Sequence, residues 1–311
     1  MICLENNVNQ TTLFIFAKIR IFKLMSETKV FSINISNFKL DGGAMFGVVP
    51  KSIWQKYYPS DENNLCTWAL RCLLIDTGNR VILIDNGIGD KQGEKFFSFL
   101  HMSGGDGLIG GLKKHAYRPE DITDMILTHL HFDHCGGGVR HNANRTGYEL
   151  VFPNATYWVG SRQWEWAMNP NNREKDSYLD ENLLPMMDSG KIKFVDENME
   201  LFQGMNLKLF NGHTEGQIIP SFSHKGKTIV YMGDLMPSTV HVPAHYNMAY
   251  DVRPLVSMLE KEEFLKEAFE NDYLLFFEHD LYNECCTLKE TPRGIRVDKT
   301  YSLEEYFDMR R

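Results

Sequence analysis

Residues 128–136 read THLHFDHCG, and no other run of this chain is as rich in metal-binding side chains. They are His129, His131, Asp133 and His134. In an extended chain, residues i and i+2 share a face, so the imidazoles of His129 and His131 can point to one place. The glycines at 136–138 allow the backbone to bend sharply or approach a neighbour closely. Imidazole and carboxylate together suit zinc, iron(II), cobalt or manganese, so the run predicts a metal site.

Three later strand-like runs are each followed by a side chain of the same kind. LKLF, TIVYMG and YLLFFE lead, within three positions, into His213, Asp234 and His279. Open α/β architectures place their sites at the carboxyl ends of strands, whereas surface histidines in a loop would show no matching pattern elsewhere. We therefore expect two metal ions. The first is held by His129, His131 and His213, the second by Asp133, His134 and His279, and Asp234 bridges them.

The rest of the chain predicts strands mixed with helices. Short runs bounded by Gly, Asn or Asp predict buried strands at 72–76, 81–85, 125–129, 157–160, 207–211, 228–234 and 273–280. The four residues 77–80 between the first two runs predict a hairpin. Residues 254–271 predict an amphipathic helix, with an apolar face of Leu255, Met258, Leu259, Leu265, Ala268 and Phe269. Such a mixture predicts a layered α/β or α+β domain.

Composition narrows the class of protein. The chain has 311 residues, 43% of them hydrophobic and 24% charged, which permits one large domain with a sizeable core. A formal charge of −8 without a Lys/Arg cluster argues against a nucleic-acid partner. Six cysteines without CxxC spacing predict free thiols in a reducing compartment, so we expect a cytoplasmic location. Cys135 is expected to pack beside the metals rather than to bind them.

The first residues differ from the remainder. Residues 1–24 are apolar but interrupted by Lys18, Arg20 and Lys23, and they lack the features of a secretory signal or a membrane span. We therefore predict an N-terminal extension over 1–24, a single domain over 25–311 and no membrane partner. The extension could serve a homodimer.

HLHFDH, at 129–134, is the HxHxDH signature, and the chain resembles the metallo-β-lactamase superfamily from about residue 38 to about residue 282. The later ligand positions match it as well. The resemblance implies a four-layer αββα sandwich. It also implies that Asp85 is a buried aspartate that orients metal ligands through hydrogen bonds, although the residues alone suggest a turn aspartate before Gly87.

Within the superfamily, five segments resemble one branch, the quorum-quenching N-acyl-homoserine-lactone lactonases. They also resemble, more distantly, enzymes of the methyl-parathion-hydrolase kind. The segments are LDGGAMFGVVPKSIW (40–54), THLHFDHCGG (128–137), FPNATYWVG (152–160), DLMPS (234–238) and MAYDVRP (248–254). The resemblance implies that the substrate is a lactone, whereas the spacing of the ligands implies only a metallohydrolase.

The expected reaction is the opening of a lactone ring by a hydroxide that bridges two divalent metals, expected to be zinc. Asp133 and Asp234 are the expected catalytic carboxylates. A phosphotriesterase or another carboxylic-ester hydrolase is the alternative on the same site. A thioester hydrolase ranks lower because the C-terminal tail is short and mixed in charge. A β-lactamase ranks low because Asp133 and Asp234 are both present, and a non-enzymatic protein would have lost ligands.

Substrate contacts are less strongly indicated. Many lactonases of this fold carry a tyrosine three residues after the bridging aspartate, where this chain has Pro237. His241, His245 or Tyr250 could take over its contact with the substrate carbonyl. An acyl pocket could be lined by Met45, Phe46, Val48 and Trp54, which could equally pack in the core. Trp164 and Trp166 could lie at the mouth of the site or on a helix, and Gln217 replaces a histidine that is not usually a ligand.

Overall fold

Two β-sheets lie face to face at the centre of the computed structural model, which describes residues 28–309. The predicted N-terminal extension, 1–24, lies outside the described residues. The first sheet contains, in spatial order, β1 (Lys29–Asp41), β2 (Leu65–Asp76), β3 (Val81–Ile84), β4 (Asp124–Ile126), β7 (Thr156–Gly160) and β8 (Ile192–Val195). The second contains β15 (Gly294–Tyr301), β14 (Cys285–Thr291), β13 (Leu274–Phe276), β12 (Lys227–Tyr231), β11 (Gln217–His224), β10 (Met205–Phe210) and β9 (Met199–Phe202).

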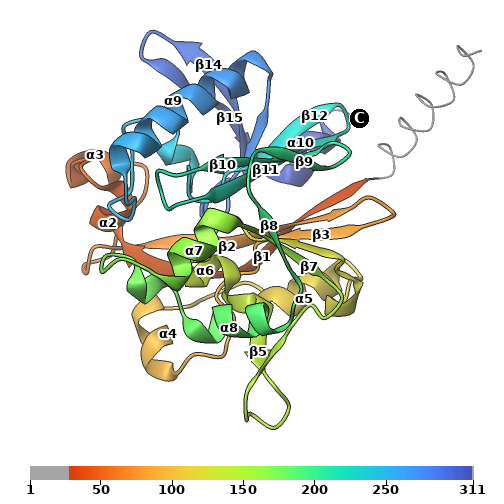
Figure 1. The fold of residues 1–311 in the computed structure, drawn as a ribbon. Helices are drawn as coiled ribbons and strands as arrows, with labels where there is room; N and C mark the ends of the chain where they lie inside the picture. Colours follow the sequence, from red (N-terminus) through yellow and green to blue (C-terminus); the bar gives the residue numbers. More distant parts are fainter. Residues whose placement is uncertain (1–27, 310–311) are drawn as a thin grey trace, which may run out of the picture.

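Helices cover the outer faces of both sheets. Figure 1 shows α4 (Glu94–Leu100), α5 (Gly107–Lys114) and α8 (Asp180–Asp188) on the outer side of the first sheet, and α9 (Pro254–Glu270) on the outer side of the second. The other elements are α2 (Gly42–Phe46), α3 (Lys51–Trp54), α6 (Phe132–Cys135), α7 (Ser161–Met168), α10 (Leu303–Asp308) and the hairpin β5 (Val139–His141) with β6 (Tyr148–Leu150).

Side chains that alternate between the two faces of a strand explain why the first sheet is covered on both faces. In β2, Leu73 and Ile75 join a buried cluster with residues of the second sheet, whereas Cys72 and Leu74 join the cluster beneath the helices. Successive side chains of a strand point to opposite faces, so a strand that is apolar at every position is buried on both. The predicted αββα sandwich is therefore confirmed. The predicted hairpin is confirmed too, since β2 and β3 pair antiparallel across residues 77–80.

Parallel pairing brings the predicted metal ligands to one edge. β3 pairs in parallel with β4, and β12 with β13, so each pair ends at the same side of its sheet. The strand expected at 125–129 already ends at Ile126, which leaves His129 in the loop that follows. A Cβ on Gly136 would lie 2.1 Å from the carbonyl oxygen of Ile88, and one on Gly137 would lie 2.0 Å from that of Asn86. These glycines therefore let the histidine-rich loop lie directly on the loop after β3.

Helix α9 forms as predicted, but the expected apolar face is wrong in its first half. Leu255 is 72% exposed and Leu259 is 56% exposed, whereas Lys261 is only 1% exposed. The Lys261 ammonium donates to the carbonyl oxygens of Pro243 and Tyr246, at 3.3 and 2.9 Å. The helix is therefore held by a buried amine at its middle and by packed apolar side chains only in its second half.

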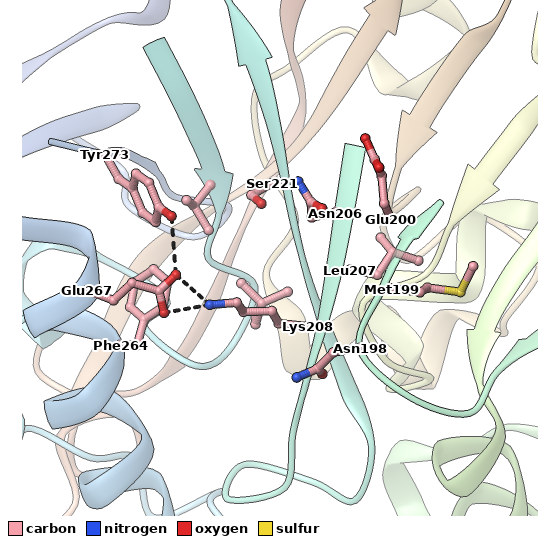
Figure 2. A pocket seen from close by; sticks show the side chains of 12 residues that line it. Asn198, Met199, Glu200, Asn206, Leu207, Lys208, Ser221, Phe264, Glu267 and Tyr273 are labelled. Carbon is pink, nitrogen blue, oxygen red and sulfur yellow. Dashed lines mark hydrogen bonds and ion pairs between the residues drawn. The ribbon is translucent and has the colours of Figure 1, made fainter. Parts of the chain in front are cut away.

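A hollow of about 300 Å³ lies between α9 and strands β10 to β12 (Figure 2). The Lys208 ammonium pairs with the Glu267 carboxylate across it, and the hydroxyl of Tyr273 donates to the same carboxylate at 3.2 Å. None of the residues that line the hollow is a predicted metal ligand.

Over residues 28–309, no helix is both long enough and apolar enough to cross a membrane. The cysteines in this range, Cys66, Cys72, Cys135, Cys285 and Cys286, are all free, as expected.

Candidate metal centre

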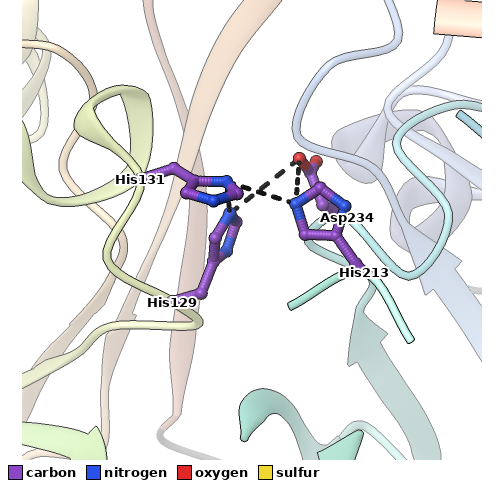
Figure 3. A group of neighbouring side chains, drawn as sticks. All are labelled: His129, His131, His213 and Asp234. Carbon is purple, nitrogen blue, oxygen red and sulfur yellow. Dashed lines mark hydrogen bonds and ion pairs between the residues drawn. The ribbon is translucent and has the colours of Figure 1, made fainter. Parts of the chain in front are cut away.

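The predicted ligands meet at the edge where the strands end. Figure 3 shows His129 and His131, from the loop between β4 and α6, facing His213 and Asp234, from the loops after β10 and β12. We call His129, His131 and His213 the first cluster, and Asp133, His134 and His279 the second. The ligand atoms of the first cluster and Asp234 all lie within 4.8 Å of one another, and so do those of the second cluster.

The first cluster has the dimensions of a metal site. His129 Nε2 lies 3.0 Å from His131 Nδ1, which lies 3.3 Å from His213 Nε2. His213 Nε2 lies 3.2 Å from Asp234 Oδ2. Four ligands at zinc–nitrogen distances of about 2.0–2.1 Å in a tetrahedron are separated from each other by roughly 3.3 Å. The donor atoms are thus already spaced as one ion requires.

The second cluster shares Asp234 with the first. His134 Nε2 and His279 Nε2 lie 3.3 Å apart, and each lies 3.8 Å from Asp133 Oδ2. Asp234 Oδ1 lies 3.3 Å from His279 Nε2, while Asp234 Oδ2 faces the first cluster and lies 3.6 Å from His134 Nε2. One carboxylate therefore presents oxygens to both clusters, as expected for a bridging ligand.

Hydrogen bonds to the outer nitrogens of the ligand histidines indicate which imidazole nitrogens carry protons. His131 Nε2 lies 3.3 Å from Glu174 Oε1, His213 Nδ1 lies 2.9 Å from Asp251 Oδ1, and His279 Nδ1 lies 2.8 Å from the carbonyl oxygen of Ala69. Carboxylates and carbonyls only accept, so these nitrogens are the donors. The opposite nitrogen of each ring then points a lone pair into the centre.

The partners of His129 and His134 place the proton of each ring on Nδ1 in the same way. The Thr128 hydroxyl donates to Asp85 Oδ2 at 2.7 Å, so its oxygen accepts from His129 Nδ1 at 3.1 Å. His134 Nδ1 lies 3.0 Å from Asp85 Oδ2 and 3.0 Å from Glu278 Oε2. When they carry no second proton, all the ligand histidines direct lone pairs at one another across short distances. Such lone pairs repel unless cations lie between them, so the residues fit two divalent ions.

The pKa values of the clusters differ. Burial lowers the pKa of His129 well below its usual value and also lowers that of His131. Burial opposes charge on His279 as well, but Asp234 and Glu278 outweigh it and raise the pKa of His279 to about 9. Burial and the charge of Asp85 outweigh His134 and raise the pKa of Glu278 to about 7. Burial also opposes charge on His213, but Asp234 and Asp251 outweigh it and raise its pKa, so without metals protons collect on the second cluster and on His213, away from His129 and His131.

Asp85 lies where the resemblance implied, in contact with Thr128 and His134, and its role in orienting metal ligands stays a prediction. It is fully buried at the end of β3, and its Oδ1 accepts from the Thr128 amide at 2.7 Å. Asp251, Glu174 and Glu278, which contact ligand histidines in the same way, were not found from the sequence. Each stands alone in a loop or at a strand end without a spacing pattern. For Glu278 alone there was a signal, since it directly precedes a predicted ligand.

The expected substrate contacts divide into buried and exposed residues. Met45, Phe46 and Trp54 are at most 2% exposed and pack in the core. His241 is buried against Phe46, and both of its ring nitrogens have partners, the Ser238 hydroxyl at 2.7 Å and the Met45 carbonyl oxygen at 2.8 Å. These four side chains therefore offer no open surface to a ligand, and direct substrate contact by any of them stays a prediction.

The remaining candidates lie on the surface. Val48 is 92% exposed and Tyr250 is 39% exposed. Their loops touch, because the Ala249 amide donates to the Ala44 carbonyl oxygen at 2.7 Å. His245 is exposed and packs edge-on against Tyr246.

Other residues singled out in the sequence are placed as follows. Trp164 is 5% exposed on α7, while Trp166, on the same helix, donates from Nε1 to Glu174. Gln217 is buried and belongs to neither ligand cluster. Cys135 is buried with its thiol 3.3 Å from the Leu130 carbonyl oxygen, also outside the clusters.

Comparison with known proteins agrees with this geometry. Residues 71–141 match the model of the metallo-β-lactamase superfamily. A probable metal-dependent hydrolase from Staphylococcus aureus is 31% identical, with a TM-score of 0.81 over 90% of this chain and 98% of that protein.

Two lactonases are also similar. The N-acyl homoserine lactonase of Bacillus cereus is 27% identical over 168 residues, which are 51% of this chain. The matched part spans only 58% of that lactonase. The dizinc quorum-quenching lactonase AidC, solved with a product bound, has a TM-score of 0.74 over 90% of this chain and 96% of its own, at 22% identity. At that identity the likeness concerns the fold alone.

Proposed function

This chain belongs to the metallo-β-lactamase superfamily, and we propose that it is a dinuclear metallohydrolase that opens the ring of N-acyl-homoserine lactones. The assignment as a hydrolase rests on the position of Asp234, whose two oxygens face the two clusters of histidines. When bound, two divalent metals, proposed to be zinc, supply an acidic water as nucleophile and polarise the carbonyl of the substrate.

The chain's own residues supply orientation. Asp234 would accept a hydrogen bond from a nucleophile held between the clusters and so orient the lone pair of that nucleophile toward the substrate. Asp133 adds a second negative charge beside His134 and His279. The braced imidazoles cannot turn, so the geometry exists before the substrate arrives, which is the condition for electrostatic catalysis.

The lactone part rests on the similarity to lactonases and on the surface beside the metals. Tyr250 follows a residue whose amide is bonded to Ala44, and it precedes Asp251, which holds the ligand His213. Burial and the charges of Asp133, Asp41 and Asp234 raise the pKa of Tyr250 to about 12, so its hydroxyl remains a donor at neutral pH. We propose that Tyr250 donates to the substrate carbonyl in place of the tyrosine absent at Pro237, and that exposed Val48 contacts the acyl chain.

The test is acid release from N-acyl-homoserine lactones of increasing chain length, with zinc-loaded wild type beside Asp234→Asn. We expect turnover by the wild type and a loss of at least about 100-fold in the variant, because a bridging ligand contributes more than a residue outside the metal shell. Asp188→Asn, at an exposed position of α8, is the matched control and should retain full activity.

The outcomes distinguish the proposed lactone substrate from the proposed metal centre. Absence of lactone turnover by a wild type that holds two zinc ions overturns the lactonase assignment. Turnover of a phosphotriester such as paraoxon under the same conditions would then favour the alternative substrate class on the same residues.

A further inference from the structure

We propose that Glu174 is a positioning residue of the metal centre, which holds the His131 ring so that Nδ1 faces the ion. The inference rests on the proposed metal site but not on its substrate. Glu174 lies between α7 and α8, 43 residues from His131 along the chain, and its side chain is only 3% exposed.

Both oxygens of Glu174 are occupied by donors. Oε1 lies 3.3 Å from His131 Nε2 and accepts from the Tyr178 hydroxyl at 3.2 Å. Oε2 accepts from Trp166 Nε1 at 2.6 Å and from the Asn171 amide at 2.8 Å. Four donors from different side chains fix the carboxylate, so its direction toward His131 does not depend on a single contact.

His131 differs from the other ligand histidines in the nitrogen that it offers to the ion. It faces the centre with Nδ1, whereas His129, His213 and His279 face it with Nε2. A histidine that offers Nδ1 must carry its proton on Nε2, and the hydrogen bond at the second nitrogen decides which tautomer forms. Without an acceptor at Nε2, the proton could move to Nδ1 and block the lone pair that binds the ion.

The segment around Glu174 also reaches the other side of the centre. The Asn171 side-chain oxygen accepts from the amide of Arg173 at 2.8 Å, which shapes the turn. The Arg173 guanidinium donates to the carbonyl oxygen of Ala249, two residues before Asp251. Asp251 in turn holds His213. Two of the three first-cluster histidines are therefore braced by loops that are tied to each other.

The competing explanation is that Glu174 only stabilises the connection between α7 and α8. A purely structural carboxylate would affect unfolding but would leave the metal environment of correctly folded protein unchanged. The two explanations therefore differ in a measurement made on the metal itself.

The experiment is titration of metal-free full-length Glu174→Gln with zinc, and separately with cobalt(II), whose visible absorption reports ligand geometry. Glutamine has only one acceptor oxygen. Either its NH2 group faces His131 Nε2, or the NH2 group faces the donors of Trp166 and Asn171 and is pushed away from them, so in both orientations the contact that holds His131 is lost or displaced. We expect one of the two zinc equivalents to bind about 10–100-fold more weakly and the cobalt spectrum of one site to change. Glu165→Gln, an exposed position on α7, is the matched control and should behave as wild type.

A second variant covers the case in which Glu174→Gln does not fold. Trp166→Phe keeps the carboxylate and leaves an aromatic ring beside the Arg253 guanidinium, but removes the 2.6 Å donor, so we expect a smaller change of a few fold in the same zinc equivalent. Wild-type affinity and an unchanged cobalt spectrum in folded Glu174→Gln would overturn the proposal. Failure of the wild type itself to bind two metals would instead overturn the metal centre, so the two failures are distinguishable.

Discussion

The two clusters of the metal centre are braced from different parts of the molecule. His134 and His279 of the second cluster contact Asp85, Glu278 and the carbonyl of Ala69, which lie at or in the strands β3, β13 and β2. His131 and His213 of the first cluster contact Glu174 and Asp251, which lie in loops. Residues at the strand ends thus hold the second cluster and, through Thr128, also His129, whereas loops hold His131 and His213.

We expect this difference to separate effects on the unfolding free energy from effects on metal binding. A brace in the sheet core serves the fold and the metal together, so its loss should disturb both. A brace in a loop shares its segment with the surface that we propose meets the substrate, so its loss should change metal binding with little effect on unfolding. Loops are also the segments whose sequences vary most readily while a scaffold stays the same.

The largest effect is expected for Asp85→Asn. Asp85 accepts from the amide and hydroxyl of Thr128 and contacts His134, and an amide in its place leaves at least one buried donor without an acceptor. We expect loss of about 1–3 kcal/mol in the unfolding free energy of the metal-free protein, together with weaker metal binding. Urea unfolding and zinc titration measure the two effects.

Asp251→Asn is the matched comparison, because it removes a carboxylate from His213 in a loop. We expect weaker metal binding with a much smaller change in unfolding free energy. Equal destabilisation by the two substitutions would break the distinction between sheet-held and loop-held braces.

An effect of comparable size is a pH dependence of the metal-free protein. The pKa of His279 is raised from 6.5 to about 9 by Asp234 and Glu278 in spite of burial. The stabilisation by protonated His279 is therefore complete below about pH 6.5 and is lost as the pH rises through about 9. We expect the advantage of wild type over His279→Gln to fall by roughly 3 kcal/mol across this range, at 1.36 kcal/mol per pKa unit.

His131 should show the opposite sign, since burial lowers its pKa below the ordinary value of 6.5. Its contribution should be lost as the pH falls below about 6.5. Urea unfolding of metal-free wild type, His279→Gln and His131→Gln at several pH values measures both trends. Parallel pH profiles for the two variants would contradict an electrostatic difference between the clusters.

The smallest effect is expected for Tyr250→Phe. Loss of one hydrogen bond to the substrate carbonyl should lower kcat about 2- to 10-fold, without a change in the two zinc equivalents. Kinetics with one medium-chain lactone, beside the exposed control Tyr57→Phe, measure it. An unchanged kcat would remove Tyr250 from the proposed reaction and leave both clusters intact.

Much of the fold was predictable because its signals are local. The hairpin at residues 77–80, the αββα layers and the superfamily follow from short apolar runs and from HLHFDH, and all three are confirmed. The face of α9 was not predictable in the same way. The middle of the helix is buried through Lys261, whose ammonium donates to carbonyl oxygens of the loop before the helix. The sequence pattern of the helix alone gives no sign of these acceptors.

The sequence by itself determined which side chains form the two clusters. Their approach was predictable because strand ends in a layered sheet meet at one edge, although His129 and His131 lie in a loop and not in an extended strand. Only the tertiary structure decided which nitrogen of each ring faces the centre, and which residues hold it there. Glu174 and Asp251 reach their histidines over 43 and 38 positions of chain. Loop packing makes such contacts, and no local periodicity encodes them.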